Sequence, residues 1–323
     1  MMKNRIISID ILKVFAVFLV MNSHMELCYG EYGFLATGGA IGDALFFFCS
    51  GFTLLMGGAK SFDNWYKRRI SRIYPTVFAV AILSEVLFHS NNTFVETIIW
   101  GGGWFVTCLM VYYLLLYIIK RYMLEFLMQT FIAVIIINVY YFTYIFDHKG
   151  AFTMYGESYY RWMFFFIYML LGAIVGFNHD KIQAGKCDIL KLMVCVAAWY
   201  AVPILSAKFP RLTNFQWLSL LSLVGVCYYF YTICTYRFWE KLYNHRLCGQ
   251  LIFVVGGICL ETYLVQHYLW SDILNGLFPL NIPIMMVYVL MVAYVMKFFS
   301  NLIAQTFKDD DYNWKKMFLY KNE

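Results

Sequence analysis

The sequence predicts an all-α integral membrane protein, a bundle of about ten transmembrane helices with its N- and C-termini in the cytosol. The first observation is the composition, with 62% hydrophobic and only 14% charged residues; about a quarter of a soluble domain is charged. The second is a set of apolar stretches near the length of about 20 residues that a spanning helix needs. They are 7–27, 41–57, 74–90, 104–120, 125–146, 162–178, 189–206, 217–236, 249–270 and 283–303.

The distribution of lysine and arginine is the third observation, and it sets the expected orientation. Cytosolic loops of membrane proteins are enriched in both residue types. With the N-terminus in the cytosol, 21 of the 25 lysines and arginines fall on the cytosolic side of the ten stretches. If one span were missed or wrongly added, every later loop would change sides, and the excess of lysine and arginine on the cytosolic side would be lost. The net charge of +6 is therefore explained by membrane topology and gives no support to nucleic-acid binding.

The expected domain organisation is simple. Ten spans leave almost no residues for a soluble domain, so we expect one membrane domain over residues 1–308 and a short cytosolic tail over residues 309–323. Few of the five prolines lie in mid-span, which predicts helices without breaks. The nine cysteines form no C-x-x-C pair, so we expect mostly small buried hydrophobes. We expect no metal and no permanently bound cofactor.

The first stretch carries ionisable residues where a membrane helix normally has none. Lys13 and His24 are eleven residues apart, so on a helix they share one face about 16 Å apart along the axis, with Asp10 about 40° away. Such residues are costly in hydrocarbon and usually face the bundle interior or a wet cavity. In one interpretation Asp10 pairs with Lys13 and His24 bonds to a neighbouring helix. In the other, His24 belongs to a functional site.

A second histidine, His267, lies near the end of the ninth stretch. Tyr263 precedes it by one helical turn on the same face. In one interpretation His267 binds the acceptor or orients a partner; in the other it only forms a structural hydrogen bond with a neighbouring helix. Glu261 is expected to be buried and to pair with Lys13, Arg161 or a histidine.

Between the two histidines lies a basic segment at residues 67–72. Arg69 and Arg72 are three residues apart and would share a helical face. Arginine forms strong charge-assisted hydrogen bonds with phosphate. Anchoring at the cytosolic membrane surface is a sufficient explanation for Lys67 and Arg68, whereas Arg69 and Arg72 are candidates for binding an anionic substrate.

In their order and spacing these residues resemble the acyltransferase 3 family of bacterial integral-membrane O-acyltransferases. The basic residue and the histidine of that family's first span correspond to Lys13 and His24, although many relatives have arginine at the first position, and lysine lacks its planar fork. The further matching motifs are FF-x-x-SG at 46–51, R-x-x-R and I-x-P at 69–75, W-F-V at 104–106, Arg161 followed by Gly172, and E-x-Y-L-x-x-H at 261–267. The serine and glycine of the FF-x-x-SG segment are small residues, which indicates close helix packing there.

The resemblance implies transfer of an acyl group, commonly acetyl from acetyl-CoA, to a hydroxyl of a cell-surface or lipid-linked glycan. It also implies the bacterial cytoplasmic (inner) membrane as the location. His24 is then the expected catalytic base, because an apolar setting favours neutral histidine and the attacking hydroxyl must lose a proton. Arg69, Arg72 and Lys13 are expected to bind the acyl-CoA. The residues expected to bind substrate or support the site are Trp104, Arg161, Glu261, Tyr263 and His267.

Several alternatives stay open. A transporter or flippase for a glycan or lipid-linked sugar would also carry ionisable residues in its spans, although the chain shows no paired halves. A succinyl or longer acyl donor is the alternative to acetyl-CoA, and an acyl-histidine intermediate is the alternative to direct transfer. The expected partners are acyl-CoA, the glycan or lipid-linked acceptor and membrane lipids, without nucleic acid.

Overall fold

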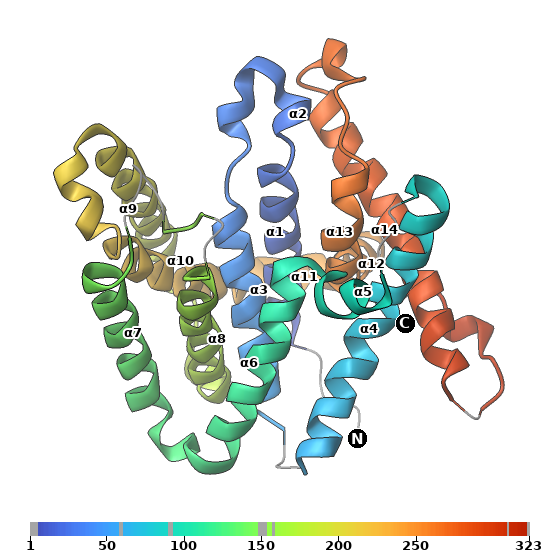
Figure 1. Cartoon of the computed structure of the whole chain (residues 1–323), viewed down its shortest axis with the longest axis horizontal. Coiled ribbons are helices and arrows are strands. Elements are labelled where there is room, and N and C mark those ends of the chain that lie inside the picture. Colours follow the sequence, from blue (N-terminus) through green and yellow to red (C-terminus); the bar gives the residue numbers. More distant parts are fainter. Residues whose placement is uncertain are drawn as a thin grey trace. The chain divides into compact units, whose positions relative to one another are not determined.

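The structure is a computed structural model that describes residues 6–57, 61–89, 93–147, 154–156, 159–308 and 310–321. Within these residues every regular element is a helix (Figure 1), so the predicted all-α class is confirmed. The α-helices are α1 (Ile7–Ser23), α2 (Glu26–Tyr29), α3 (Gly39–Leu54), α4 (Phe62–Phe88), α5 (Phe94–Trp100), α6 (Gly103–Tyr122), α7 (Leu127–Tyr144), α8 (Arg161–Phe177), α9 (Asp188–Lys208), α10 (Leu218–Cys234), α11 (Arg237–Asn244), α12 (Arg246–Gly257), α13 (Cys259–Val265) and α14 (Asn281–Thr306).

The helices are those of a multi-pass membrane protein. Among the described residues five helical segments are long and apolar enough to cross a membrane, namely α4, α6, α7 with the turn before it, α9 and α14. Three bent pairs pass the same test, which raises the number to eight if each is one span. The apolar helices α3 and α8 are shorter, with 16 and 17 residues. Each of the ten predicted stretches falls on one of these helices or bent pairs, while the cytosolic position of the termini stays a prediction.

The expectation of unbroken helices is wrong at the three bends, which measure 68°, 57° and 59°. None of them lies at a proline. Where α1 ends, Ser23 Oγ donates a hydrogen bond to the carbonyl of Val20 at 2.8 Å, and just after α10 Thr235 Oγ1 donates to the carbonyl of Thr232 at 2.7 Å. Hydroxyls that bond back to the preceding turn compete with the helix and bend it. The third bend follows two adjacent glycines at the end of α12, a common cause of kinks.

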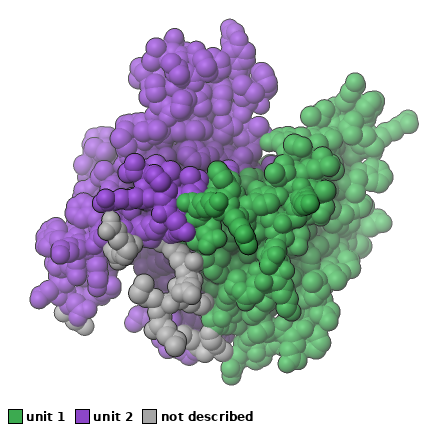
Figure 2. All heavy atoms as spheres, turned by 180° about the vertical axis from the view of Figure 1, so that it is seen from behind, with its two compact units in different colours: residues 1–12, 43–59, 118–241 green, residues 13–42, 60–117, 242–323 purple. Residues whose placement is uncertain are grey.

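The chain forms two compact units (Figure 2), of which unit 1 comprises residues 1–12, 43–59 and 118–241. Within unit 1, α10 packs against α8 and α9, and α7 packs against α8. Helices α3 and α8 approach each other closely, because a Cβ atom added to Gly172 would lie 2.0 Å from the carbonyl oxygen of Phe48. Only glycine permits this approach, in agreement with the packing role expected of the FF-x-x-SG segment.

Unit 2 comprises residues 13–42, 60–117 and 242–323. Here α14 packs against α4 and α13, and α13 also contacts α4. The segment 310–321 returns to this group of helices, since Asn301 Nδ2 donates to the carbonyl of Met317 at 2.9 Å and the Met317 side chain is completely buried. Met317 thus anchors the expected tail within unit 2, and the domain boundary at residue 308 stays a prediction.

Candidate active site

The two histidines singled out in the sequence lie together in unit 2. The ring centroids of His24 and His267 are 4.6 Å apart, and the rings meet edge to face. Both side chains are exposed. Each histidine lies at a helix break, because α1 ends at Ser23 and His267 belongs to the short 3₁₀ turn Gln266–Tyr268 that follows α13. The helix that was expected to place Lys13 and His24 on one continuous face therefore stops one residue before His24.

Hydrogen bonds made by Asn22 hold the chain on both sides of His24. The Asn22 amide nitrogen donates to the carbonyls of Leu35 and Thr37 at 2.8 and 2.9 Å. The Tyr29 hydroxyl donates to the Asn22 amide oxygen at 2.6 Å. The end of α1 is thus tied to the turn that follows it. Nothing in the sequence marks Asn22 as a site residue, because asparagine is common at helix ends that belong to no site.

The segments that follow the two histidines are joined to each other. Asn281 Nδ2 donates to the carbonyl of Cys28 at 2.7 Å, and the Cys28 thiol donates to the carbonyl of Ser271 at 3.4 Å. Met25 and Cys28 belong to a small buried cluster against which Trp270 packs. These contacts join the segments that follow the two rings and so hold His24 and His267 side by side.

Aromatic side chains continue from His267 into unit 2. The Tyr263 ring lies 6.2 Å from that of His267, and Phe105 lies 5.1 Å from Tyr263. Trp104 is half-buried and meets Phe105 at 5.9 Å. Gly103 opens α6 with φ of 63°, in the left-handed region that favours glycine, and so directs Trp104 into the first turn. Three of the predicted supporting residues, Trp104, Tyr263 and His267, therefore follow one aromatic row.

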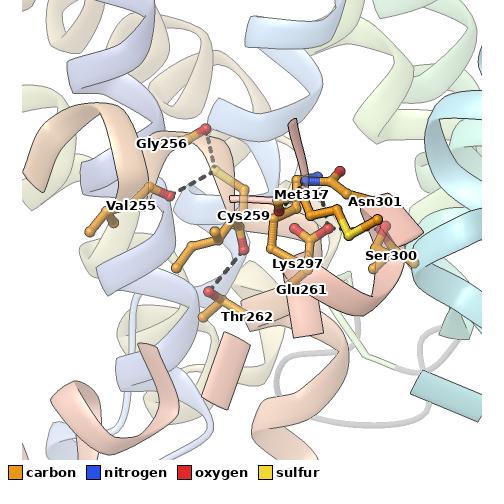
Figure 3. Close-up of polar contacts among 11 residues, drawn as sticks. Val255, Gly256, Cys259, Glu261, Thr262, Lys297, Ser300, Asn301 and Met317 are labelled. Atoms are coloured by element: carbon orange, nitrogen blue, oxygen red, sulfur yellow. Dashed lines mark hydrogen bonds and ion pairs between the residues drawn. The ribbon is translucent and has the colours of Figure 1, made fainter. Parts of the chain in front are cut away.

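Glu261, at the start of α13, belongs to a buried polar network (Figure 3). Its Oε1 atom accepts a hydrogen bond from Lys297 Nζ at 3.0 Å and another from Thr76 Oγ1 at 2.7 Å. The hydroxyls of Thr76 and Ser300 share a further hydrogen bond of 2.7 Å. The Glu261 side chain is only 1% exposed, so these groups replace its contact with water. The network links α13 to α4 and α14.

The sequence-based expectation for the partner of Glu261 is wrong. Lys297 pairs with it, whereas Lys13, Arg161 and the histidines were expected to do so. The reason is tertiary: α13 and α14 are neighbours in unit 2, which brings Lys297 within reach. A signal was present in the sequence, because a lysine within the apolar stretch 283–303 needs a partner.

The two arginines predicted to bind the acyl donor have different environments. Arg69 is half-buried, and its guanidinium carbon lies 4.7 Å from the centroid of the Trp65 ring and 5.8 Å from that of Tyr113. Arg72, one turn later on α4, is exposed. Spacings of three, four and seven residues put Trp65, Arg69, Arg72 and Thr76 on one face of α4. The cationic face of α4 thus continues into the polar network of α13.

The remaining predicted site residues are Lys13 and Arg161. Lys13 is half-buried on α1 in unit 2. Arg161 begins α8 in unit 1, within electrostatic range of Asp43. All predicted site residues except Arg161 thus lie in unit 2. Among the described residues no three His, Cys, Asp or Glu side chains gather in a way that could hold a metal ion.

Comparison with known proteins supports the resemblance carried by these motifs. The acyltransferase domain of the acyltransferase 3 family matches residues 6–298, which is most of the chain. The chain belongs to the acyltransferase 3 family. Membership makes it a membrane acyltransferase and implies both an acyl donor and an acceptor. No curated protein and no solved structure matches the chain.

For an acyltransferase of this family, unit 2 offers two kinds of chemistry. The exposed imidazoles of His24 and His267 can accept and return a proton. The guanidinium groups of Arg69 and Arg72 carry positive charge of the kind that binds anionic groups. Both features lie in the same compact unit, in which α4 contacts α13, the helix that leads to His267.

Proposed function

We propose that this acyltransferase is an O-acetyltransferase that moves acetyl from acetyl-CoA to a hydroxyl of a cell-surface or lipid-linked glycan. The proposed location is the bacterial cytoplasmic membrane. The main support is the contact between His24 and His267, with ring centroids 4.6 Å apart, in the unit that also carries the cationic face of α4. Acyl transfer from a CoA thioester to a hydroxyl requires two elements, a proton acceptor and a face that binds the anionic CoA.

His24 is the proposed catalytic base. Its neutral imidazole takes the proton of the acceptor hydroxyl while that oxygen attacks the thioester carbonyl carbon. The carbon–sulfur bond then breaks, and the leaving CoA sulfur receives the proton from the imidazolium. A positioned base of this kind contributes about 10²–10⁴-fold to the rate. In the alternative route the imidazole attacks the carbonyl first, the carbon–sulfur bond breaks, and CoA leaves as its thiol with a proton from the ring. The acceptor hydroxyl then attacks the acetyl-histidine, the carbon–nitrogen bond breaks, and the hydroxyl proton returns to the imidazole.

His267 is proposed to orient the His24 ring or to contact the acceptor, because the two rings touch edge to face. Trp104 and Tyr263 extend the aromatic row from this point, and aromatic faces suit the apolar side of a sugar ring. Glu261 is proposed to support the site through α13. Arg161 is proposed to bind substrate, as implied by its match to the family motif.

Arg69 and Arg72, with Lys13, are proposed to bind the phosphates of acetyl-CoA. Seven residues separate Arg69 from Thr76, or about 10 Å of helix. Thr76 hydrogen-bonds to Glu261, from which α13 leads to His267. We propose that the pantetheine arm follows this line from the arginines to the histidine pair, with the acceptor hydroxyl entering from the opposite side.

The test is acetyl transfer by the purified protein in lipid nanodiscs. The expected result is label passing from labelled acetyl-CoA to a glycan or lipid-linked sugar acceptor, and its loss in His24→Ala that is correctly inserted. Transfer from succinyl-CoA but not from acetyl-CoA would change the donor and leave the mechanism in place. If no CoA thioester donates an acyl group to any such acceptor, the proposed function is wrong.

A further inference from the structure

The environment of Arg69 is unusual for a cation near a membrane surface. Its guanidinium carbon lies 4.7 Å from the Trp65 ring centroid and 5.8 Å from that of Tyr113. Its Nε atom is buried and has no hydrogen-bond partner among the described residues. No carboxylate of the described residues forms an ion pair with Arg69 either. Aromatic faces attract a guanidinium through the ring quadrupole without neutralising its charge. The positive charge of Arg69 is therefore not neutralised by these contacts, and an anionic group can still pair with it.

The Trp65 ring is itself held in place. It is 4% exposed, and its indole nitrogen donates to the carbonyl of Tyr113 on α6 at 3.1 Å. Trp65 precedes Arg69 by four residues on α4, a spacing that puts two side chains on the same face. Trp65 is therefore tied to α6, the helix that carries the second aromatic contact of Arg69, the buried ring of Tyr113. Arg68 and Arg72, by contrast, have exposed side chains.

We propose that Trp65 and Tyr113 are positioning residues that hold the Arg69 guanidinium ready for a phosphate of the acyl donor. This inference rests on the proposed function, because it concerns the donor's phosphates. A carboxylate could also orient Arg69, but it would occupy the N–H groups that a phosphate needs. Stacking on aromatic faces leaves those N–H groups available at the edge of the guanidinium plane. A side chain that is already ordered also loses less conformational freedom when the donor binds.

The test compares two donors that share the thioester and the pantetheine arm but differ in phosphates, acetyl-CoA and S-acetylpantetheine. Trp65→Leu removes the aromatic face, and we expect it to lower kcat/KM for acetyl-CoA by about 2- to 30-fold, the range of a cation–π contact. The kcat/KM for S-acetylpantetheine should stay unchanged. Trp65→Phe retains a ring and should have a smaller effect. Tyr113→Leu should repeat the selective loss if Trp65→Leu does not fold.

A second measurement does not require S-acetylpantetheine to act as a donor. Adenosine 3′,5′-bisphosphate carries phosphates of CoA but no thioester, so its inhibition constant should rise in Trp65→Leu by the same factor. The matched control is Tyr66→Phe, because the Tyr66 hydroxyl also links α4 to α6, through the carbonyl of Met110 at 3.4 Å. This variant should change neither donor preference nor inhibition.

The outcomes separate the inference from the proposed function. Equal losses with both donors in Trp65→Leu and Tyr113→Leu, with unchanged inhibition by the bisphosphate, would show a purely structural role and overturn the inference. If Arg69→Gln discriminates between the donors while the aromatic variants do not, only the positioning role fails. If Arg69→Gln itself shows no discrimination, the assignment of Arg69 to the donor's phosphates fails, and the inference fails with it.

Discussion

The carboxylate of Glu261 and the ammonium group of Lys297 form an ion pair of 3.0 Å that joins α13 to α14 inside unit 2. The Glu261 side chain is almost completely shielded, and its second oxygen is buried without a hydrogen-bond partner in the described part of the chain. Removing one member of a buried pair leaves an uncompensated charge. Because α13 leads directly to Tyr263 and His267, this pair also bears on the candidate active site.

Lys297→Met should therefore destabilise the protein, by about 3–5 kcal/mol if the Glu261 carboxylate stays charged. Glu261→Gln combined with Lys297→Met should recover most of this loss, because no buried charge remains. The measurement is thermal unfolding in detergent, with Lys308→Met as the control for an exposed lysine just after the end of α14. Equal losses in the single and double variants would show that the pair contributes no coupling.

His24→Ala should lower kcat by about 10²–10⁴-fold and leave acetyl-CoA affinity nearly unchanged, since the base acts only in the transfer step. Single-turnover transfer and donor binding, both measured in nanodiscs, separate the two quantities. His245→Asn is the matched control, because it replaces an exposed histidine at the start of α12 by another good N-cap residue. Full activity of a correctly inserted His24→Ala would end the catalytic assignment.

His267→Ala should lower kcat less than His24→Ala if His267 orients the His24 ring. The free-energy effects of substituting two residues in contact are generally not additive, and the coupling free energy is typically about 0.5–3 kcal/mol. The double variant should therefore be no slower than His24→Ala alone. His267→Phe keeps an edge-to-face ring and should recover part of the rate. Strictly additive effects on kcat would mean that the two histidines act independently.

Arg72→Ala should weaken acetyl-CoA binding by about 1.5–3 kcal/mol, the range for a lost hydrogen bond to a charged group. Arg72→Lys should recover only part of the affinity, because lysine restores the charge without the planar fork. Binding titrations at two ionic strengths provide the measurement. Arg68→Ala, which removes an exposed neighbouring charge, is the control. An Arg72→Ala affinity equal to that of Arg68→Ala would contradict a specific phosphate contact.

Gly172→Ala should destabilise unit 1, because the new Cβ would lie 2.0 Å from the carbonyl oxygen of Phe48 and α3 and α8 would have to separate. Overpacking of this kind costs typically about 1–3 kcal/mol. Gly276→Ala is the matched control, since a Cβ there meets no atom within 4 Å. Thermal unfolding of the two variants gives the comparison. Identical unfolding midpoints for Gly172→Ala and Gly276→Ala would show that α3 and α8 separate without loss of stability.

The helices could largely be predicted from the sequence, because about 20 apolar residues in a row have few alternatives to a membrane span. The breaks could not, since they depend on local hydroxyl bonds such as that of Ser23 to Val20 and on adjacent glycines without proline. Apolar length and proline content do not report these bonds. The break after Ser23 matters for the site, because it places His24 beyond the helix.

The candidate site was predictable residue by residue but not in its contacts. His24 and His267 stood out because ionisable groups are rare in spans, yet their ring contact joins segments 243 residues apart and needs the tertiary fold. The same holds for the aromatic platform of Arg69. Trp65 and Tyr113 belong to residue types that are abundant throughout this chain, so nothing in their spacing alone marks them.

The segment 310–321 has a practical consequence for recombinant work. The Tyr294 hydroxyl donates to the carbonyl of Leu319 at 3.2 Å, and Lys321 Nζ donates to the carbonyl of Tyr243 at 2.7 Å. A gene truncated where the family match ends, at residue 298, would shorten α14 and strip its remainder of this cover. The bared apolar surface would favour aggregation during purification. Affinity tags and fluorescent fusions should therefore follow Lys321 through a flexible spacer.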